Sequence, residues 1–183
     1  TYLLAAQNTA EIRASGGFPG SMGTVSIDNG AIELGDFTKV YDMMAEDTPA
    51  QCAITDEENA LFYPWYTQYS WDNSFNPDYP RVAGIWAAAY QEKTDQSVDG
   101  VISITPTMVQ DLLATTGDSF TLSDGTAIDG TNATKVLQHD LDWKYFSSGS
   151  STSESNDVCD ALFAEAAEYA FDSALENMNA SSL

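Results

Sequence analysis

The segment from Gln7 to Gly23 reads Q-N-T-A-E-I-R-A-S-G-G-F-P-G-S-M-G and is a polar stretch between two apolar ones. It carries Arg13, one of only six basic residues in a chain of 183 residues with a net charge of −22. Four glycines follow Arg13 closely, at Gly16, Gly17, Gly20 and Gly23. Glycine permits positive φ angles and exposes backbone N–H groups, which suits a tight turn or the close approach of an anion.

Two interpretations of this segment remain open. In the first, the Arg13 guanidinium clamps a phosphate or carboxylate in bidentate fashion. The other ligand-binding candidates of the segment are then Asn8, Glu11, Gly16, Gly17, Gly20 and Ser21. In the second, Arg13 pairs with Glu11 or another carboxylate, and the glycines only turn corners. The segment matches no Walker or dinucleotide-binding fingerprint.

Three sequence blocks occur in a fixed order along the chain. They are N-x-A-E-x-R-x-x-G-G-F-x-G-S-x-G in this segment, W-D-N-S-F-N-P-D-Y-P at Trp71–Pro80, and V-D-G-V-I-S-I-T-P at Val98–Pro106, followed by L-L-A-T-T-G. Together they cover about the first two thirds of the chain and resemble a bacterial family known as domain of unknown function 4012. That family has no established activity, so the resemblance implies a domain without implying a function.

The order of elements is also remotely similar to the LytR-CpsA-Psr family, whose members transfer glycopolymers from a polyprenyl pyrophosphate carrier to the cell wall. The similarity is strongest where a strand at Val98–Ile104 precedes a helix at Thr107–Leu113. The chain length predicts one domain over residues 1–183. The order of strand, helix and strand predicts an α/β fold with a mixed, largely parallel central sheet flanked by helices, as in that family. A lipid-linked glycan or cell-wall polymer is the implied partner.

If that chemistry is retained, the catalytic candidates are Arg13, Asp42 and Asp78. Arg13 would neutralise phosphate charge, while Asp42 or Asp78 would hold Mg²⁺. The competing hypothesis is a non-catalytic module that binds an envelope polymer or partner, or that braces a larger cell-surface protein.

The composition excludes several classes of function. Hydrophobic residues make up 43% and aromatic residues 11% of the chain, which is typical of globular proteins, and no apolar run approaches the roughly 20 residues of a membrane span. Six Lys and Arg residues against 28 Asp and Glu residues repel nucleic-acid backbones and anionic lipids, so nucleic-acid binding is excluded. We expect an extracytoplasmic fragment of a longer protein, with any membrane anchor outside this fragment.

The two cysteines, Cys52 and Cys159, have no metal-ligand spacing. A disulfide between them would tie the region before Trp71 to the last helix and contribute about 4 kcal/mol. Two unrelated thiols are the alternative.

The N-terminal third predicts strands and a hairpin. Asp28–Gly30 is an Asn-Gly turn that supplies positive φ angles. It joins the second and third of the strands predicted at Tyr2–Ala6, Met22–Ile27 and Ala31–Leu34. Lys39–Met44 continues toward Asp42, which we expect to face the same cleft as Arg13.

Ala45–Tyr79 is a loop-like region, rich in aromatic residues toward its end. Its length predicts a lid, a binding loop or several short elements. These aromatics either form a platform for sugars or lipids, or seal the loop onto the core. Four residues of this region have the oxygen-rich spacing of a Ca²⁺ or Mg²⁺ site: Asp72, Asn73, Asn76 and Asp78. Asp78 is equally typical of a helix N-cap. Arg81 is a candidate second anion contact or a member of a surface ion pair.

The rest of the chain predicts alternating helices and short strands, with His139 as an exposed helix residue rather than a catalytic one. The predicted elements are a helix at Pro80–Lys93, a strand at Val98–Ile104, a helix from the Thr105 cap to Gly117, a hairpin at Ser119–Ile128, a helix at Asn132–Tyr145, a serine-rich linker at Ser147–Ser155 and a helix at Asn156–Met178.

Overall fold

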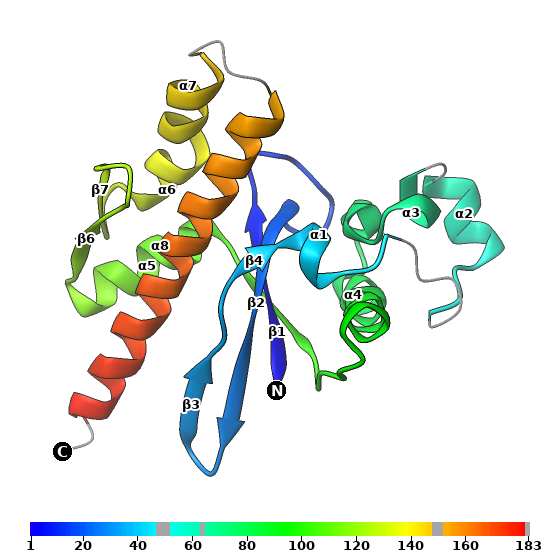
Figure 1. The fold of residues 1–183 in the computed structure, drawn as a ribbon, viewed down its shortest axis with the longest axis horizontal. Coiled ribbons are helices and arrows are strands. Elements are labelled where there is room, and N and C mark those ends of the chain that lie inside the picture. The colour runs from blue at the N-terminus through cyan, green and yellow to red at the C-terminus, as the bar shows by residue number, and fades with distance from the viewer. Residues whose placement is uncertain (47–51, 63–64, 148–151, 182–183) are drawn as a thin grey trace. The chain divides into compact units, whose positions relative to one another are not determined.

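The structure is a computed structural model that describes residues 1–46, 52–62, 65–147 and 152–181 (Figure 1). Contacts between Cα atoms divide the chain into two compact units, Thr1–Ser103 and Ile104–Leu183. The fold is of the mixed α/β class, as the sequence predicts.

The first unit is built on a sheet with the strand order β3-β2-β1-β5, in which β4 also pairs with β2. The bounds of its strands are β1 Tyr2–Asn8, β2 Phe18–Asp28, β3 Ala31–Leu34, β4 Thr38–Lys39 and β5 Val101–Ile104. The predicted hairpin is confirmed, because β2 and β3 are joined by Asn29 and Gly30 with φ angles of 50° and 91°.

The sheet is mixed, but the prediction that it is largely parallel is wrong. Strand β2 runs antiparallel to β1, β3 and β4. The hydrogen bonds from Asp99 N to Thr1 O (2.8 Å) and from Leu3 N to Gly100 O (3.0 Å) advance in the same direction along both segments, so β5 runs parallel to β1. A parallel connection needs a crossover of a dozen or more residues, and the glycine-rich segment between β1 and β2 is too short for one.

Of the alternatives for Ala45–Tyr79, the structure shows several short elements in the residues that it describes. This region contains short helices, and its residues 47–51 and 63–64 lie outside the described residues. The helices of the first unit are α1 Val40–Met43, α2 Asp56–Phe62, α3 Trp65–Gln68, the 3₁₀ helix η1 Ser70–Phe75 and α4 Tyr79–Thr94. Helix α2 starts with a reciprocal capping box, in which Glu58 N donates to Thr55 Oγ1 (3.1 Å) and Thr55 N donates to Glu58 Oε2 (2.9 Å).

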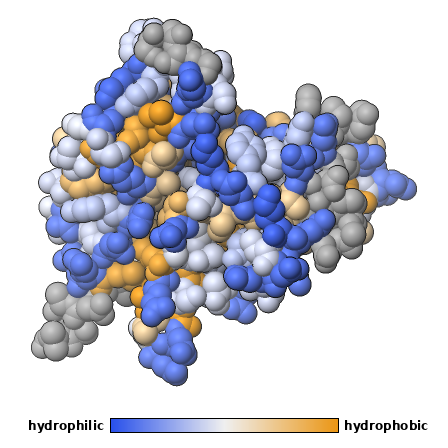
Figure 2. Space-filling model, viewed as in Figure 1, coloured by the Kyte–Doolittle hydropathy of each residue, from blue (hydrophilic) through white to orange (hydrophobic). Residues whose placement is uncertain are grey.

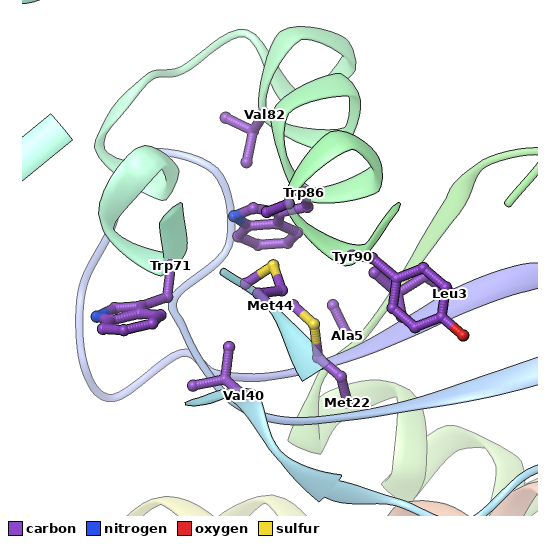
Figure 3. Close-up of a cluster of buried hydrophobic side chains, with 10 residues drawn as sticks. Leu3, Ala5, Met22, Val40, Met44, Trp71, Val82, Trp86 and Tyr90 are labelled. Carbon is purple, nitrogen blue, oxygen red and sulfur yellow. The ribbon is translucent and has the colours of Figure 1, made fainter. Parts of the chain in front are cut away.

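Helix α4 packs on the sheet to form the core of the first unit (Figure 3). Its predicted range is confirmed to within a residue at each end, and Asp78 caps it by accepting a hydrogen bond from Arg81 N (3.4 Å). The buried Trp86 lies at the centre and donates from its indole Nε1 to Ser70 O (2.9 Å), which ties η1 to α4. The cluster consists of Leu3, Ala5, Met22, Val40, Met44, Trp71, Val82, Trp86, Ala89 and Tyr90.

The second unit is mainly helical. Its elements are α5 Pro106–Thr116, β6 Ser119–Thr121, β7 Ala127–Asp129, α6 Ala133–Lys135, the π-helical turn η2 Val136–Asp140, α7 Leu141–Phe146 and α8 Thr152–Ser181. The predicted start and end of α5 are confirmed, because Thr105 Oγ1 accepts from Met108 N (3.3 Å) and Gly117 takes a left-handed φ of 78°. Helix α8 starts earlier than predicted; residues 148–151 of the predicted linker lie outside the described residues.

Both cysteines are free thiols, so the predicted disulfide is absent. Each thiol has a partner in its own unit: Cys52 Sγ accepts a hydrogen bond from Arg81 Nη1 (3.1 Å), and Cys159 hydrogen-bonds to Asp142.

Hydrophilic residues cover most of the face drawn in Figure 2, as the acidic composition leads one to expect. Within the described ranges, no helix is both long enough and apolar enough to cross a membrane.

Candidate functional site

A pocket of about 510 Å³ opens beside Arg13 in the first unit. Its described lining combines aromatic rings with one ion pair and comes from three segments: the glycine-rich loop, α1, and the stretch that runs through η1. The lining residues are Arg13, Tyr41, Tyr69, Trp71, Asp72 and Phe75.

The buried Gln7 fixes the loop that carries Arg13. Its Nε2 donates to Ser15 O (3.0 Å) and to Gly17 O (2.9 Å), and its Oε1 accepts a hydrogen bond from the Ser103 hydroxyl. Gly17 has a φ of 129°, and a Cβ atom at this position would lie 2.3 Å from Asn8 O. The turn therefore requires glycine at this position for both conformation and space.

Ser15 anchors the same loop to η1, because its backbone N and its Oγ both donate to Ser74 O, at 3.1 Å each. This contact brings Arg13 between two aromatic rings. Its guanidinium carbon lies 4.6 Å from the ring centroid of Phe75 and 5.5 Å from that of Phe18. At these distances the guanidinium gains a cation–π interaction with each ring.

The ion pair of the pocket joins Arg13 and Asp72. Arg13 Nη2 lies 3.6 Å from Asp72 Oδ1, and 19% of the Arg13 side chain is exposed. Burial raises the pKa of Asp72, and the positive charge of Arg13 partly opposes that rise. Arg13 Nη1 donates to Ile12 O (3.3 Å), and its buried Nε has no partner among the described residues. The guanidinium is thus held mainly by aromatic rings and keeps a face toward the pocket.

The pocket's other aromatic rings surround Trp71. Tyr69 stacks on Trp71 with ring centroids 5.3 Å apart, and Tyr41 meets it edge to face at 4.7 Å. Trp71 is only 7% exposed, whereas Tyr41 is 47% exposed. Trp71 therefore belongs to the core, Tyr69 packs partly buried against it, and Tyr41 exposes a large part of its side chain.

Several predicted ligand-binding residues lie outside the pocket lining and support the loop instead. Asn8 Oδ1 accepts from Ala10 N (3.0 Å), and Asn8 Nδ2 donates to Glu11 Oε1 (3.4 Å). Gly16 belongs to the turn with Gly17, at a φ of 108°. Gly20 and Ser21 are buried within strand β2.

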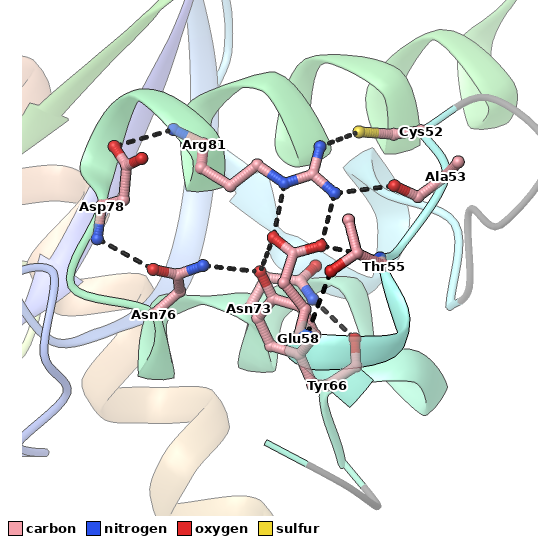
Figure 4. Close-up of polar contacts among 9 residues, drawn as sticks. All are labelled: Cys52, Ala53, Thr55, Glu58, Tyr66, Asn73, Asn76, Asp78 and Arg81. Carbon is pink, nitrogen blue, oxygen red and sulfur yellow. Dashed lines mark hydrogen bonds and ion pairs between the residues drawn. The ribbon is translucent and has the colours of Figure 1, made fainter. Parts of the chain in front are cut away.

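Asn73 and Asn76 belong to a separate polar network around Tyr66 (Figure 4). Asn73 Nδ2 donates to Tyr66 O (2.6 Å), and Asn76 Nδ2 donates to the Tyr66 hydroxyl (3.0 Å). Asn76 Oδ1 accepts from Asp78 N (2.9 Å). These amides connect α3 to the segment that leads into α4, which is a structural task.

Arg81 binds Glu58 in bidentate fashion in the same network. Its Nε donates to Glu58 Oε1 (2.6 Å) and its Nη2 to Glu58 Oε2 (2.8 Å). Nη1 donates to Cys52 Sγ, and Nη2 also donates to Ala53 O (2.7 Å). The hydrogen bonds from Arg81 lower the pKa of Glu58 to about 2. All three guanidinium nitrogens therefore donate to the protein, and Arg81 fastens α2 to α4.

The two predicted Mg²⁺ ligands lie apart from the Arg13 pocket lining. Asp42 is exposed in the first turn of α1, and Asp78 is the exposed N-cap of α4. In the part of the chain that the structure describes, no three His, Cys, Asp or Glu side chains are grouped so that they could hold a metal ion. A role for either residue in binding Mg²⁺ stays a prediction.

Two residues that matter for this geometry, Glu58 and Tyr41, were not among the candidates from the sequence, and Asp72 was a candidate only as a metal ligand. The role of Glu58 at the start of a helix could have been predicted, because Thr55-x-x-Glu58 is a capping-box pattern. Asp72 lies inside the block at Trp71–Pro80, but its pairing with Arg13 joins distant parts of the chain. Tyr41 carries no local signal that separates it from an ordinary helix residue.

Comparison with known proteins gives one match. The sequence model of a family described as "Protein of unknown function (DUF4012)" matches residues 1–141, which include every lining residue of the Arg13 pocket. No curated protein and no solved structure matches the chain.

Proposed function

The chain belongs to the DUF4012 family of proteins of unknown function, and from the pocket beside Arg13 we propose that it is a non-catalytic cell-envelope module that binds a neutral glycan. The observation that supports this proposal is the combination of two partly open tyrosines, Tyr41 and Tyr69, with the Arg13–Asp72 ion pair in one pocket of about 510 Å³. Ligand pockets of roughly this size typically pair apolar walls with a few polar groups.

A sugar ring is recognised by an apolar surface together with polar groups. Its C–H face packs on aromatic rings, and its hydroxyl groups donate to a carboxylate and accept from a guanidinium. In the pocket, Tyr41 and Tyr69 supply the rings, Asp72 supplies the acceptor, and Arg13 supplies the donor. A glycan would therefore find its two recognition elements side by side.

The charges favour a neutral glycan over an anionic one. Asp72 offsets the single positive charge of Arg13 at 3.6 Å. The net charge of −22 repels anions from the protein as a whole. A neutral sugar incurs no such repulsion. We propose that the module acts outside the cytoplasm.

A second candidate function is the transfer of a glycopolymer from a polyprenyl pyrophosphate, as in the LytR-CpsA-Psr family that the chain remotely resembles. One observation favours it: the Arg13 guanidinium keeps a face toward a pocket and is not sealed in the core. A pyrophosphate needs more positive charge, however. Arg13 is the one cationic side chain among the described lining residues, and the proposed Mg²⁺ ligands Asp42 and Asp78 are not part of that lining. Glycan binding without catalysis therefore has the stronger support.

The test is a calorimetric titration with a neutral oligosaccharide, the tetramer of N-acetylglucosamine. We expect wild-type binding with a Kd near 1 mM, roughly −4 kcal/mol. Tyr41→Ala should weaken binding by about two- to tenfold, because one aromatic contact contributes roughly 0.5 to 1.5 kcal/mol. Tyr169→Ala is the matched control, since Tyr169 is 40% exposed and lies in the second unit. It should bind as the wild type does.

A parallel titration with farnesyl pyrophosphate, with and without Mg²⁺, separates the two candidate functions. Mg²⁺-dependent binding that is lost in Arg13→Gln, with no response to the oligosaccharide, would favour transfer and overturn the glycan proposal. Equal oligosaccharide affinity of wild type and Tyr41→Ala would show that the Arg13 pocket is not the binding site. Thermal unfolding of each variant establishes that the fold is retained.

A further inference from the structure

A second pocket, of about 540 Å³, lies along η2 and α7 in the second unit. Among the described residues its lining shares none with the Arg13 pocket, and we call it the α7 pocket. Two of its aromatic side chains are unusually open, because Trp143 is 72% and Phe146 is 40% exposed. Large apolar side chains that gather at an exposed pocket indicate an interaction site. Its lining residues are Gln138, His139, Asp142, Trp143, Phe146 and Ser147.

A carboxylate lies among these rings. Asp142 is partly buried, and this burial raises the pKa of its carboxyl group. A hydrogen bond from the Cys159 thiol and the charge of His139 oppose the rise, but they do not cancel it. The negative charge of Asp142 is therefore incompletely compensated by the protein.

The basic groups nearest to Asp142 in sequence are directed to other carboxylates. Lys144 Nζ pairs with Asp124 Oδ2 (2.7 Å). Lys135 Nζ contacts both carboxylate oxygens of Asp140, at 2.6 and 2.5 Å, and His139 Nδ1 lies 2.8 Å from Asp140 Oδ1. The His139 ring is parallel to that of Trp143, with an interplanar angle of 1° and centroids 6.4 Å apart. His139 thus extends the aromatic wall, while its Nδ1 is hydrogen-bonded to Asp140.

From this arrangement we propose that the α7 pocket binds an alkylammonium ion. Trp143 and Phe146 would pack against its methyl or methylene groups and attract its charge through their ring faces. Asp142 would form the charge pair. The net charge of −22 raises the local concentration of cations at such a site, in contrast to the neutral ligand that we propose for the Arg13 pocket.

The test follows the indole N–H resonance of Trp143 by two-dimensional NMR, assigned from its loss in Trp143→Phe. Hexyltrimethylammonium and hexylamine at millimolar concentration are the cationic probes, and hexanol is the neutral one. We expect both cations to shift the resonance saturably, and hexanol to shift it much less. The ratio of the two cation affinities tells whether the pocket prefers a quaternary or a primary ammonium group.

Two variants test the role of the carboxylate. Asp142→Asn should weaken binding of the cations by roughly fivefold, which is about the largest effect expected from losing a partly exposed charge pair. Asp111→Asn removes the same charge from an exposed position on α5, outside the pocket lining, and should leave the affinity unchanged.

Three outcomes would overturn the proposal. If hexanol bound as tightly as hexyltrimethylammonium, the site would be a purely apolar groove. Equal effects of Asp142→Asn and Asp111→Asn would reduce the binding to a general attraction of cations to an acidic protein. An unchanged Trp143 resonance would mean that neither cation binds there. Because the comparison with hexanol uses the wild-type protein, it decides the question even if Asp142→Asn fails to fold.

Discussion

Gly17 turns the chain between the first two strands at a position where no side chain fits. Replacing it with alanine would force a Cβ atom to within 2.3 Å of Asn8 O and 2.6 Å of the adjoining carbon, at a φ of 129°. Both neighbours are backbone atoms, so they cannot rotate away. We expect Gly17→Ala to lower the free energy of unfolding by about 2 to 4 kcal/mol, measured by urea denaturation.

Gly30→Ala is the control for this prediction. Gly30 also has a positive φ, of 91°, but a Cβ atom there would meet nothing within 4 Å. Only backbone strain is added, so a loss of about 1 kcal/mol is expected. Equal losses in the two variants would mean that the loop moves to accept a side chain at Gly17.

A second prediction concerns how the ion pair between Glu58 and Arg81 makes the free energy of unfolding depend on pH. Folding lowers the pKa of Glu58 from 4.5 to about 2, so its contribution is fully present above pH 4.5 and is lost as the pH falls through 2. At pH 7 we expect Glu58→Gln to lower the free energy of unfolding by about 1 to 2 kcal/mol. The difference from wild type should shrink steadily between pH 4.5 and 2.

Denaturation curves across this pH range provide the measurement. Glu57→Gln is the matched control, because Glu57 is the preceding, exposed residue of α2. A gap between wild type and Glu58→Gln that stays constant with pH would show that the carboxylate is not the source of the stability.

Among the elements, those predicted correctly have strong local signals. The β2–β3 hairpin follows from the Asn-Gly turn, and α4 and α5 follow from a cap residue with proline in the first turn. The short helices α2, α3 and η1 could be predicted only as unresolved short elements of a loop-like region, because their bounds depend on distant contacts such as the hydrogen bond from Trp86 to Ser70 O. The share of parallel strand pairs in the sheet was overestimated, because the residues of one strand do not determine which strand it pairs with.

The candidate site shows the same difference between local signals and distant contacts. Arg13 and the aromatic residues near Trp71 stand out in the sequence, so the kinds of side chain in the pocket could be predicted. Their grouping could not, because the Arg13–Asp72 pair and the contact between Tyr41 and Trp71 join segments far apart in the chain. For Arg81 the sequence left two alternatives, an anion contact and an ion pair, and the structure shows the ion pair. Its partners Glu58 and Cys52 use its donors within the protein.

Helix α2 gives a prediction at the scale of one element. Thr55→Ala removes the hydroxyl that accepts from Glu58 N and should destabilise α2 by about 0.5 to 2 kcal/mol. Faster amide hydrogen exchange in α2, with exchange in β1 unchanged, is the expected result. Thr55→Ser keeps the acceptor oxygen and should restore slow exchange. If serine fails to do so, the methyl group of Thr55 rather than its hydroxyl supports the helix.

At the scale of the whole molecule, the dominant feature is the excess of acidic over basic residues. Six basic residues cannot pair with 28 acidic ones, and the described ion pairs already engage Arg13, Arg81, Lys135 and Lys144. Most carboxylates therefore repel one another across the surface. This repulsion opposes the compact state and is weakened by salt.

Sodium chloride should consequently stabilise the protein while acting differently on its two proposed ligands. Raising the salt from about 0.01 to 0.1 M shortens the screening length from roughly 30 to 10 Å. We expect the free energy of unfolding to increase by on the order of 1 kcal/mol, because long-range repulsion is screened more than close ion pairs such as Arg81–Glu58. Across the same range, alkylammonium binding at the α7 pocket should weaken and neutral glycan binding at the Arg13 pocket should not change. A fall in stability with salt would mean that the few close ion pairs outweigh the repulsion, and a salt-sensitive glycan affinity would mean that the ligand of the Arg13 pocket carries charge.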